Sequence, residues 1–192
     1  GRTGADVVGD LDEETWADLV ATVSAMLTPV GSPTEVDPAS DDATLRKVVL
    51  ARDLVGTVPG HADLRRLVRS LASAYPDTWV YAVDGLIGAS PETLVTVSGG
   101  QVTARVLAGT VARGANPDAD RDAALALATS AKDLAEHGYA VRSLVDALTP
   151  HTTALAAAEQ PFTLSLPNVW HLATDVEATT AAGTSALDLV GV

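Results

Sequence analysis

The feature that most constrains the fold is a glycine-containing turn between two apolar runs. Residues 94–97 and 102–106 are mostly aliphatic or β-branched, and Ser98-Gly99-Gly100-Gln101 lies between them. Glycine adopts the positive φ angles of tight hairpin turns without steric cost, so this segment predicts an antiparallel β-hairpin. In a doubly wound nucleotide-binding sheet, helices separate successive strands, and the pattern therefore argues against that fold.

The remaining apolar patterns predict helices around such strands. Apolar residues at helical spacing predict helices over 11–28, 61–74 and 118–148. Extended segments are predicted over 45–52, 79–87 and 162–166, and the Pro-rich stretch 28–42 is predicted to be a loop or linker. The predicted class is α+β, with antiparallel sheets covered by helices.

Composition excludes several classes of function. The 192 residues are 47% hydrophobic, enough for a sizeable core, and carry a formal net charge of −13. Such a charge disfavours nucleic acid and anionic membranes as partners. The chain has no cysteine, which excludes thiolate catalysis and Cys-based zinc sites, and it lacks a run of about 18 apolar residues.

Two residues are candidates for acid–base chemistry. Lys47 shares a predicted strand face with Val49 and Ala51, so it is either an edge-strand charge or a partly buried base. Glu92 follows Ser90-Pro91 at a predicted turn, where it is either a solvated carboxylate or a general acid.

Three further places are ambiguous when each is taken alone. Gly109, before Thr110, allows either a turn or a close approach of the backbone to a ligand. Glu136 lies about 200° around the predicted helix from Leu134, which favours a solvent-facing charge. His171 in an apolar run is either a structural residue or part of a pocket.

Taken in order, five segments resemble the chorismate-binding enzymes, a family that contains isochorismate, salicylate, anthranilate and aminodeoxychorismate synthases. The segments are 46–52, 88–92 (Gly-Ala-Ser-Pro-Glu), 107–110 (Leu-Ala-Gly-Thr), 130–137 and 170–172 (Trp-His-Leu). Their order and spacing carry the resemblance, which runs from about residue 44 to the end. It implies a variable upstream region over 1–43 and the first part of the catalytic domain over 44–192.

The resemblance also implies roles for individual residues. Lys47 falls on the general base that activates water to attack C2 of chorismate, and Glu92 on the general acid that protonates the departing C4 hydroxyl. Gly109 matches a backbone contact to the substrate, and Thr110 belongs to the same motif. His171 matches a residue that lines the pocket, and Glu136 matches a ligand of Mg²⁺, the expected cofactor. A local cation suits an acidic protein that binds a dianion.

The resemblance is closest to isochorismate synthases of the menaquinone type, which are cytoplasmic isomerases, through Lys47 and residues 168–175. Salicylate synthases share the lysine and remain an alternative, as does a siderophore-pathway isochorismate synthase. A non-catalytic binding module of the same fold is the alternative from another class. The oligomeric state is not predicted.

The family is longer than this chain. Beyond residues 184–189 the family pattern continues with a His-Pro-Thr segment, a substrate-binding arginine, a glycine-rich stretch and a second magnesium-binding glutamate. We therefore expect the 192-residue stretch by itself to be inactive.

Overall fold

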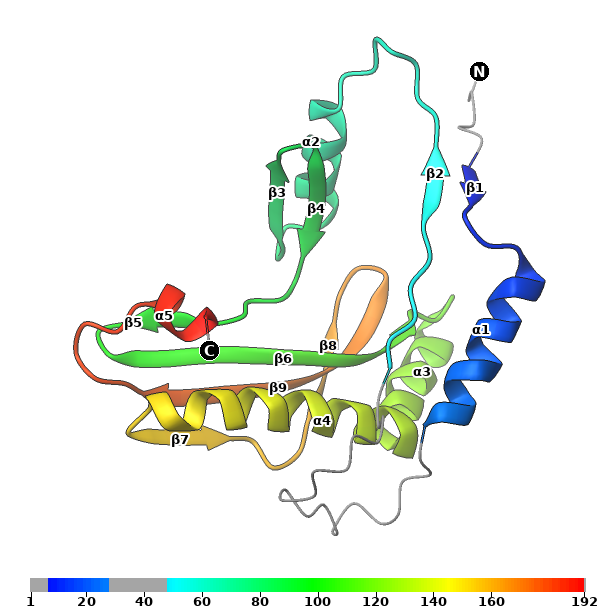
Figure 1. Cartoon of the computed structure of the whole chain (residues 1–192). Helices are drawn as coiled ribbons and strands as arrows, with labels where there is room; N and C mark the ends of the chain where they lie inside the picture. Colours follow the sequence, from blue (N-terminus) through cyan, green and yellow to red (C-terminus); the bar gives the residue numbers. More distant parts are fainter. Residues whose placement is uncertain (1–6, 28–47, 192) are drawn as a thin grey trace. The chain divides into compact units, whose positions relative to one another are not determined.

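The computed structural model describes residues 7–27 and 48–191 (Figure 1). By its internal contacts the chain divides into two compact units, one ending at Asp63 and the other beginning at Leu64. None of the helices in the described ranges is both long and apolar enough to cross a bilayer.

In its described residues, the first unit contains a helix and a short antiparallel strand pair, namely β1 (Val7–Gly9), α1 (Glu13–Met26) and β2 (Leu54–Gly56). The predicted helix over 11–28 is confirmed as α1. It begins after Asp12, whose carboxylate accepts a hydrogen bond from the Thr15 N–H at 2.8 Å.

The predicted strand over 45–52 is wrong for residues 48–52, which form neither helix nor strand. Strand β2 begins instead at Leu54, because its hydrogen-bonded pairing with β1 starts at that residue. The Asp10 N–H donates to the Asp53 carbonyl, and the Asp53 N–H donates to the Asp10 carboxylate, both at 3.1 Å.

The second unit carries the main sheet and its covering helices. Its elements are α2 (Arg65–Ala74), β3 (Trp79–Val83), β4 (Leu86–Ser90), β5 (Thr96–Ser98), β6 (Gln101–Ala112), α3 (Pro117–Thr129), α4 (Ala131–Leu148), a 3-10 turn (Thr149–His151), β7 (Ala154–Ala157), β8 (Phe162–Ser165), β9 (Val169–Thr179) and α5 (Ala186–Val190). The prediction of an α+β class with antiparallel strands is confirmed.

Glycine turns set the hairpins of this unit. Gly99 and Gly100 have φ values of 58° and 81° and join β5 to β6, as predicted. The segment 79–87, predicted as one strand, is instead the hairpin of β3 and β4. Its turn is Asp84-Gly85, with φ values of 47° and 88°, because both residues adopt the left-handed conformation of a tight turn.

The helix predicted over 118–148 is two helices that meet at Ser130. Ser130 is extended, with ψ at 109°, so it ends α3 and starts α4. Its hydroxyl oxygen accepts a hydrogen bond from the Asp133 N–H at 3.2 Å, which is the usual role of an N-cap serine. The apolar spacing continues across the break, which explains why periodicity did not reveal it.

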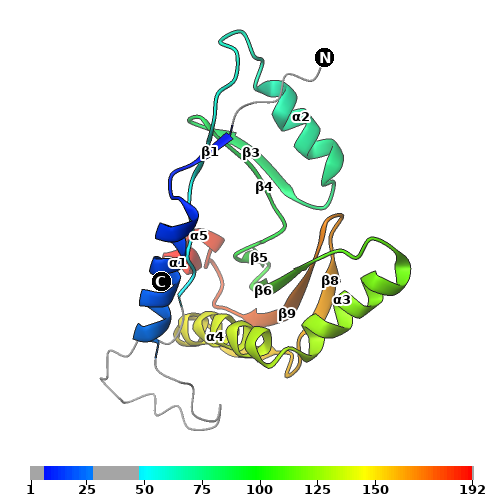
Figure 2. The same ribbon diagram turned by 90° about the vertical axis from the view of Figure 1, so that its right-hand side faces the viewer.

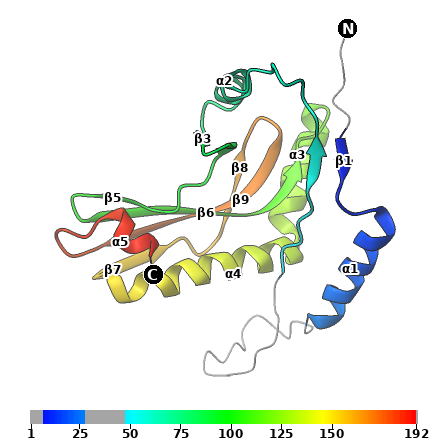
Figure 3. The ribbon, with the colours of Figure 1, turned by 45° about the horizontal axis from the view of Figure 1, so that its top comes forward.

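The main sheet has the strand order β5-β6-β9-β7, and β8 also pairs with β9. Helix α4 runs along one face of β6 and β9 (Figures 2 and 3). The core lies between that face and the helices, and its buried residues are Val102, Ala104, Leu148, Val176, Ala178 and Leu189. Alternate residues of both strands, including Arg105 and Asp175, point to the opposite face and are exposed.

Candidate active site

A β-bulge in β6 is the most irregular feature of the sheet. Leu107 lies opposite Ala173 and Thr110 opposite His171, so Ala108 and Gly109 together face Leu172. Gly109 is buried and has a φ of 83°. A Cβ atom there would lie 3.2 Å from Leu172 Cδ1 and 3.3 Å from Asp133 Cβ, so both the conformation and the packing favour glycine.

The bulge brings three of the predicted site residues together. Thr110 follows Gly109, and its Oγ1 lies 2.8 Å from His171 Nδ1, a hydrogen bond between β6 and β9. His171 lines a cavity of about 410 Å³, a volume within the range of small-molecule sites. The other lining residues come from α2 and the segment after it, from β4 and the residue after it, and from the turn between β8 and β9 with the first residue of β9, namely Leu71, Tyr75, Thr78, Ile87, Gly88, Ala89, Pro91, Leu166, Asn168 and Val169.

His137 of α4 supports the bulge from the helix side. It is 2% exposed, and its Nδ1 lies 3.1 Å from the Ala108 carbonyl oxygen, while its Nε2 lies 2.7 Å from Thr174 Oγ1. Burial lowers the pKa of His137, against a smaller opposing effect of the bond to Ala108. The sequence analysis missed this role, although His137 lies three residues after Leu134 and four before Val141, a spacing typical of a core-facing position.

Glu136 precedes His137 on α4 and is partly buried, with 29% of its side chain exposed. The local prediction of a solvent-facing charge is therefore only partly right. The carboxylate lies 3.5 Å from Lys132 Nζ, which also lies 3.3 Å from Asp133 Oδ1. Carboxylate oxygens are the ligands that Mg²⁺ prefers, so Glu136 has suitable chemistry. In residues 7–27 and 48–191, however, no three His, Asp or Glu residues cluster closely enough to hold a metal ion.

Of the two predicted acid–base residues, Glu92 lies within the described part of the chain and Lys47 does not. Glu92 is exposed in the segment between β4 and β5, and its N–H donates to Ser90 Oγ at 3.2 Å. The neighbouring Thr93 accepts a 2.8 Å hydrogen bond from the Trp79 indole, which ties this segment to β3. Lys47 lies outside the described residues, and its role stays a prediction.

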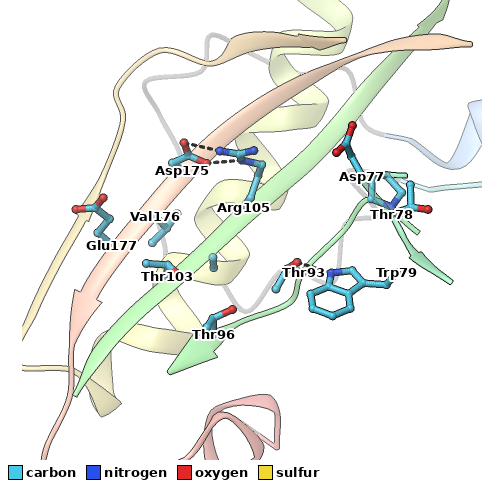
Figure 4. Close-up of a pocket in the computed structure, with 12 residues that line it drawn as sticks. Asp77, Thr78, Trp79, Thr93, Thr96, Thr103, Arg105, Asp175, Val176 and Glu177 are labelled. Carbon is cyan, nitrogen blue, oxygen red and sulfur yellow. Dashed lines mark hydrogen bonds and ion pairs between the residues drawn. The ribbon is translucent and has the colours of Figure 1, made fainter. Parts of the chain in front are cut away.

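A second cavity, of about 620 Å³, opens on the sheet face away from α4 (Figure 4). Arg105 and Asp175 line this cavity and form a bidentate ion pair. The Nε–Oδ1 distance is 2.5 Å and the Nη2–Oδ2 distance is 3.0 Å. These hydrogen bonds lower the pKa of Asp175. The guanidinium also lies 5.5 Å from the centre of the Phe162 ring. Among the described residues that line this cavity, Arg105 is the one cation, and its charge is matched by Asp175.

A polar cluster anchors the start of β9 beside His171. Arg113 donates to both carboxylate oxygens of Asp120, at 2.7 and 2.5 Å, and to Ser165 Oγ at 2.7 Å. The Trp170 indole N–H donates to the same carboxylate at 3.0 Å, and its ring lies 4.5 Å from the guanidinium carbon. The hydrogen bonds from Arg113 hold the pKa of Asp120 far below its ordinary value.

Comparison with known proteins shows which family the chain resembles. Residues 34–192 match the protein family described as chorismate binding enzyme. A Mycobacterium tuberculosis protein with the provisional name isochorismate synthase MenF is 36% identical over 187 residues, which covers 88% of this chain and 50% of that protein. Isochorismate synthase DhbC of Bacillus subtilis is 35% identical over 147 residues, covering 71% of this chain and 37% of that protein.

Among solved structures, one from Bacillus anthracis, described provisionally as the 2,3-dihydroxybenzoate-specific isochorismate synthase DhbC, matches with a TM-score of 0.75 and 28% identity. The match covers 97% of this chain and 49% of that one. The chain thus spans half or less of the length of these relatives.

Proposed function

The chain belongs to the family of chorismate-binding enzymes, and we propose on that basis that it forms part of an isochorismate synthase. The observation that carries the proposal is the bulge in β6. It places Thr110 opposite His171, which lines a cavity of suitable size for a small carboxylic acid, and Gly109 lies next to Thr110 in the bulge. All three residues lie in segments that resemble the family.

In the proposed reaction, Lys47 takes a proton from water as its oxygen adds to C2 of chorismate. The ring double bonds shift, and the C4 hydroxyl leaves as water after Glu92 supplies a proton. One water enters and one leaves, so the net change is an isomerisation. The exposed position of Glu92 allows it to exchange its proton with solvent between turnovers.

Substrate binding is assigned to the bulge and its partner strand. Gly109 would supply a backbone contact to the substrate, and His171 would present its ring at the cavity wall, held there by its hydrogen bond with Thr110. Glu136 is the proposed Mg²⁺ ligand, and the bound metal would hold the ring carboxylate of chorismate. We propose that the isochorismate is used for menaquinone biosynthesis in the cytoplasm. This proposal is supported by the similarity to MenF and by the sequence of residues 168–175.

The test is an assay of purified protein with chorismate and magnesium chloride, with the products separated by chromatography. We expect no turnover by the 192-residue chain alone and isochorismate without pyruvate from a longer protein that carries it, whereas salicylate plus pyruvate would identify a salicylate synthase. The assay uses the 192-residue chain and any longer protein that carries it. Wild-type protein that converts no chorismate in either form contradicts the proposal.

Two substitutions separate the proposed chemistry from general effects. Glu92→Gln should reduce kcat by about 10²–10⁴-fold, as expected when a general acid is lost. Glu159→Gln is the matched control because Glu159 is also exposed and is assigned no role. Lys47→Ala should cause a loss of similar size, and unchanged turnover in either site variant would remove that residue from the mechanism.

A further inference from the structure

The bulge in β6 interrupts the sheet at a backbone carbonyl that a side chain of α4 reaches. Ala108 and Gly109 share one opposing residue, Leu172, so the regular ladder between β6 and β9 is interrupted there. The Ala108 carbonyl is hydrogen-bonded to His137 of α4. Ala108 is half-buried, so loss of this partner would weaken the hydrogen bonding of the bulge, at a cost in free energy.

We propose that His137 is a positioning residue that fixes the bulge as a neutral imidazole with its proton on Nδ1. A carbonyl oxygen only accepts hydrogen bonds, so Nδ1 must donate to Ala108. His137 is 2% exposed and both of its partners are uncharged, which favours the neutral ring because a buried charge without a counter-charge is costly. In that ring the remaining nitrogen, Nε2, accepts the hydroxyl proton of Thr174, which is 1% exposed. The opposite tautomer would place two lone pairs against each other at Ala108.

The fixed bulge sets the geometry of the site on the other face of the sheet. Val102, Ala104, Thr174 and Val176 face the helices, whereas Thr110 and His171 face the opposite way. His137 therefore acts through the backbone at Ala108 and Gly109 and not by contact at the cavity wall. The catalytic consequence of this inference rests on the proposed function, whereas the tautomer and the bulge geometry do not.

Two buried threonines of the same chain segment provide a matched test. Thr174→Val removes the hydroxyl that His137 accepts from but keeps the side-chain shape. Thr180→Val is the control because Thr180 is 6% exposed and its hydroxyl donates to the His151 carbonyl at 3.0 Å, away from the bulge. Thr174→Ser restores the hydroxyl and should restore the wild-type values.

The first readout is nuclear magnetic resonance of the 192-residue chain, with ¹⁵N-labelled histidine and backbone. We expect His137 to show a protonated Nδ1 and an unprotonated Nε2. The amide signals of Ala108, Gly109 and Thr110 should shift in Thr174→Val and stay in place in Thr180→Val. A proton on Nε2, or equal shifts of these amides in both variants, overturns the inference.

The second readout is steady-state kinetics with chorismate, in whichever form of the protein is active. Thr174→Val should lower kcat/KM about tenfold, mainly through a higher KM. A misplaced binding contact weakens the binding of chorismate in the ground state as well as in the transition state. The kcat/KM of Thr180→Val should stay within about twofold of the wild-type value, even if its melting temperature falls as much as that of Thr174→Val. Equal kinetic losses overturn the positioning role. A wild-type protein without activity overturns the proposed function instead, and the resonance experiment still decides the position of the proton and the bulge.

Discussion

At the scale of single residues, Gly109 and Gly183 share a left-handed backbone but differ in their surroundings. Their φ values are 83° and 92°, yet an added Cβ would meet Leu172 and Asp133 at Gly109 and nothing within 4 Å at Gly183. We expect Gly183→Ala to lower the free energy of unfolding by about 1–2 kcal/mol, the cost of a left-handed alanine. Gly109→Ala should cost about 1–3 kcal/mol more, because the side chain also overpacks the bulge.

Urea unfolding of the two variants measures this difference. Equal losses would contradict the close packing described at Gly109, since the backbone strain is common to both positions. The comparison needs no catalytic activity.

Asp120 predicts a dependence of stability on pH. Its pKa is lowered in the folded protein from an ordinary value of 3.8, chiefly by hydrogen bonds from Arg113. A lowered folded pKa means that the carboxylate stabilises the protein fully above its unfolded pKa and loses this contribution progressively as the pH falls from there to the folded pKa. We expect the free energy of unfolding to begin to fall at about pH 5 and to go on falling below pH 3, and Asp120→Asn to flatten this part of the profile.

Asp118 provides the control for that experiment. It pairs with Arg121 at 2.8 Å, but both side chains are largely exposed, at 87% and 74%, and exposed pairs contribute little. Asp118→Asn should therefore leave the acid slope unchanged. A slope that survives in Asp120→Asn but not in Asp118→Asn would show that the polar cluster around Asp120 is not the origin of the pH dependence.

Sequence reasoning identified some residues of the site and missed others for a physical reason. Gly109, Thr110 and His171 lie in recognisable segments, and the structure brings them together. The role of His137 depends on contacts with Ala108, 29 residues earlier, and Thr174, 37 residues later. Such partners are set by tertiary packing, which local periodicity does not contain.

At the scale of elements, the break between α3 and α4 depends on Ser130. Its hydroxyl caps α4, so Ser130→Ala should lower the free energy of unfolding by about 0.5–2 kcal/mol. Ser143→Ala, at an exposed position inside α4, should be neutral or slightly stabilising because alanine is the better helix former. Thermal unfolding followed by circular dichroism distinguishes them, and equal effects would contradict the capping role.

Hairpins and individual helices were predictable because their signals are local. The Gly99-Gly100 turn predicts both the β5–β6 pair and its antiparallel sense. The pairing of β6 with β9 joins residues about 60–80 positions apart in the sequence. The apolar pattern of a strand does not predict which other strand it will pair with. The predicted strand over 45–52 failed in its described part for the same reason, because pairing with β1 sets the strand at Leu54–Gly56.

At the scale of the whole molecule, stability is unevenly distributed. Helix α1 contains no buried residue among those described, whereas β9 contains Leu172, Ala173, Thr174, Val176 and Ala178, all buried. We expect the amides of β6 and β9 to exchange with solvent at least about a hundredfold more slowly than those of α1, because slow exchange follows burial and packing. Hydrogen exchange measured by mass spectrometry tests this, and equal protection in α1 and β9 would contradict it.

Strand β9 is paired on both edges over nearly all its length. Strand β6 pairs with one edge, and the other edge is shared by β8, opposite residues 170–173, and β7, opposite residues 176–179. An unpaired apolar edge is what allows a sheet to recruit strands from other molecules and aggregate. The strand that contributes most buried side chains is thus shielded from such recruitment. In stressed or partly unfolded protein, we expect intermolecular pairing to begin instead at the short outer strands β5 and β7.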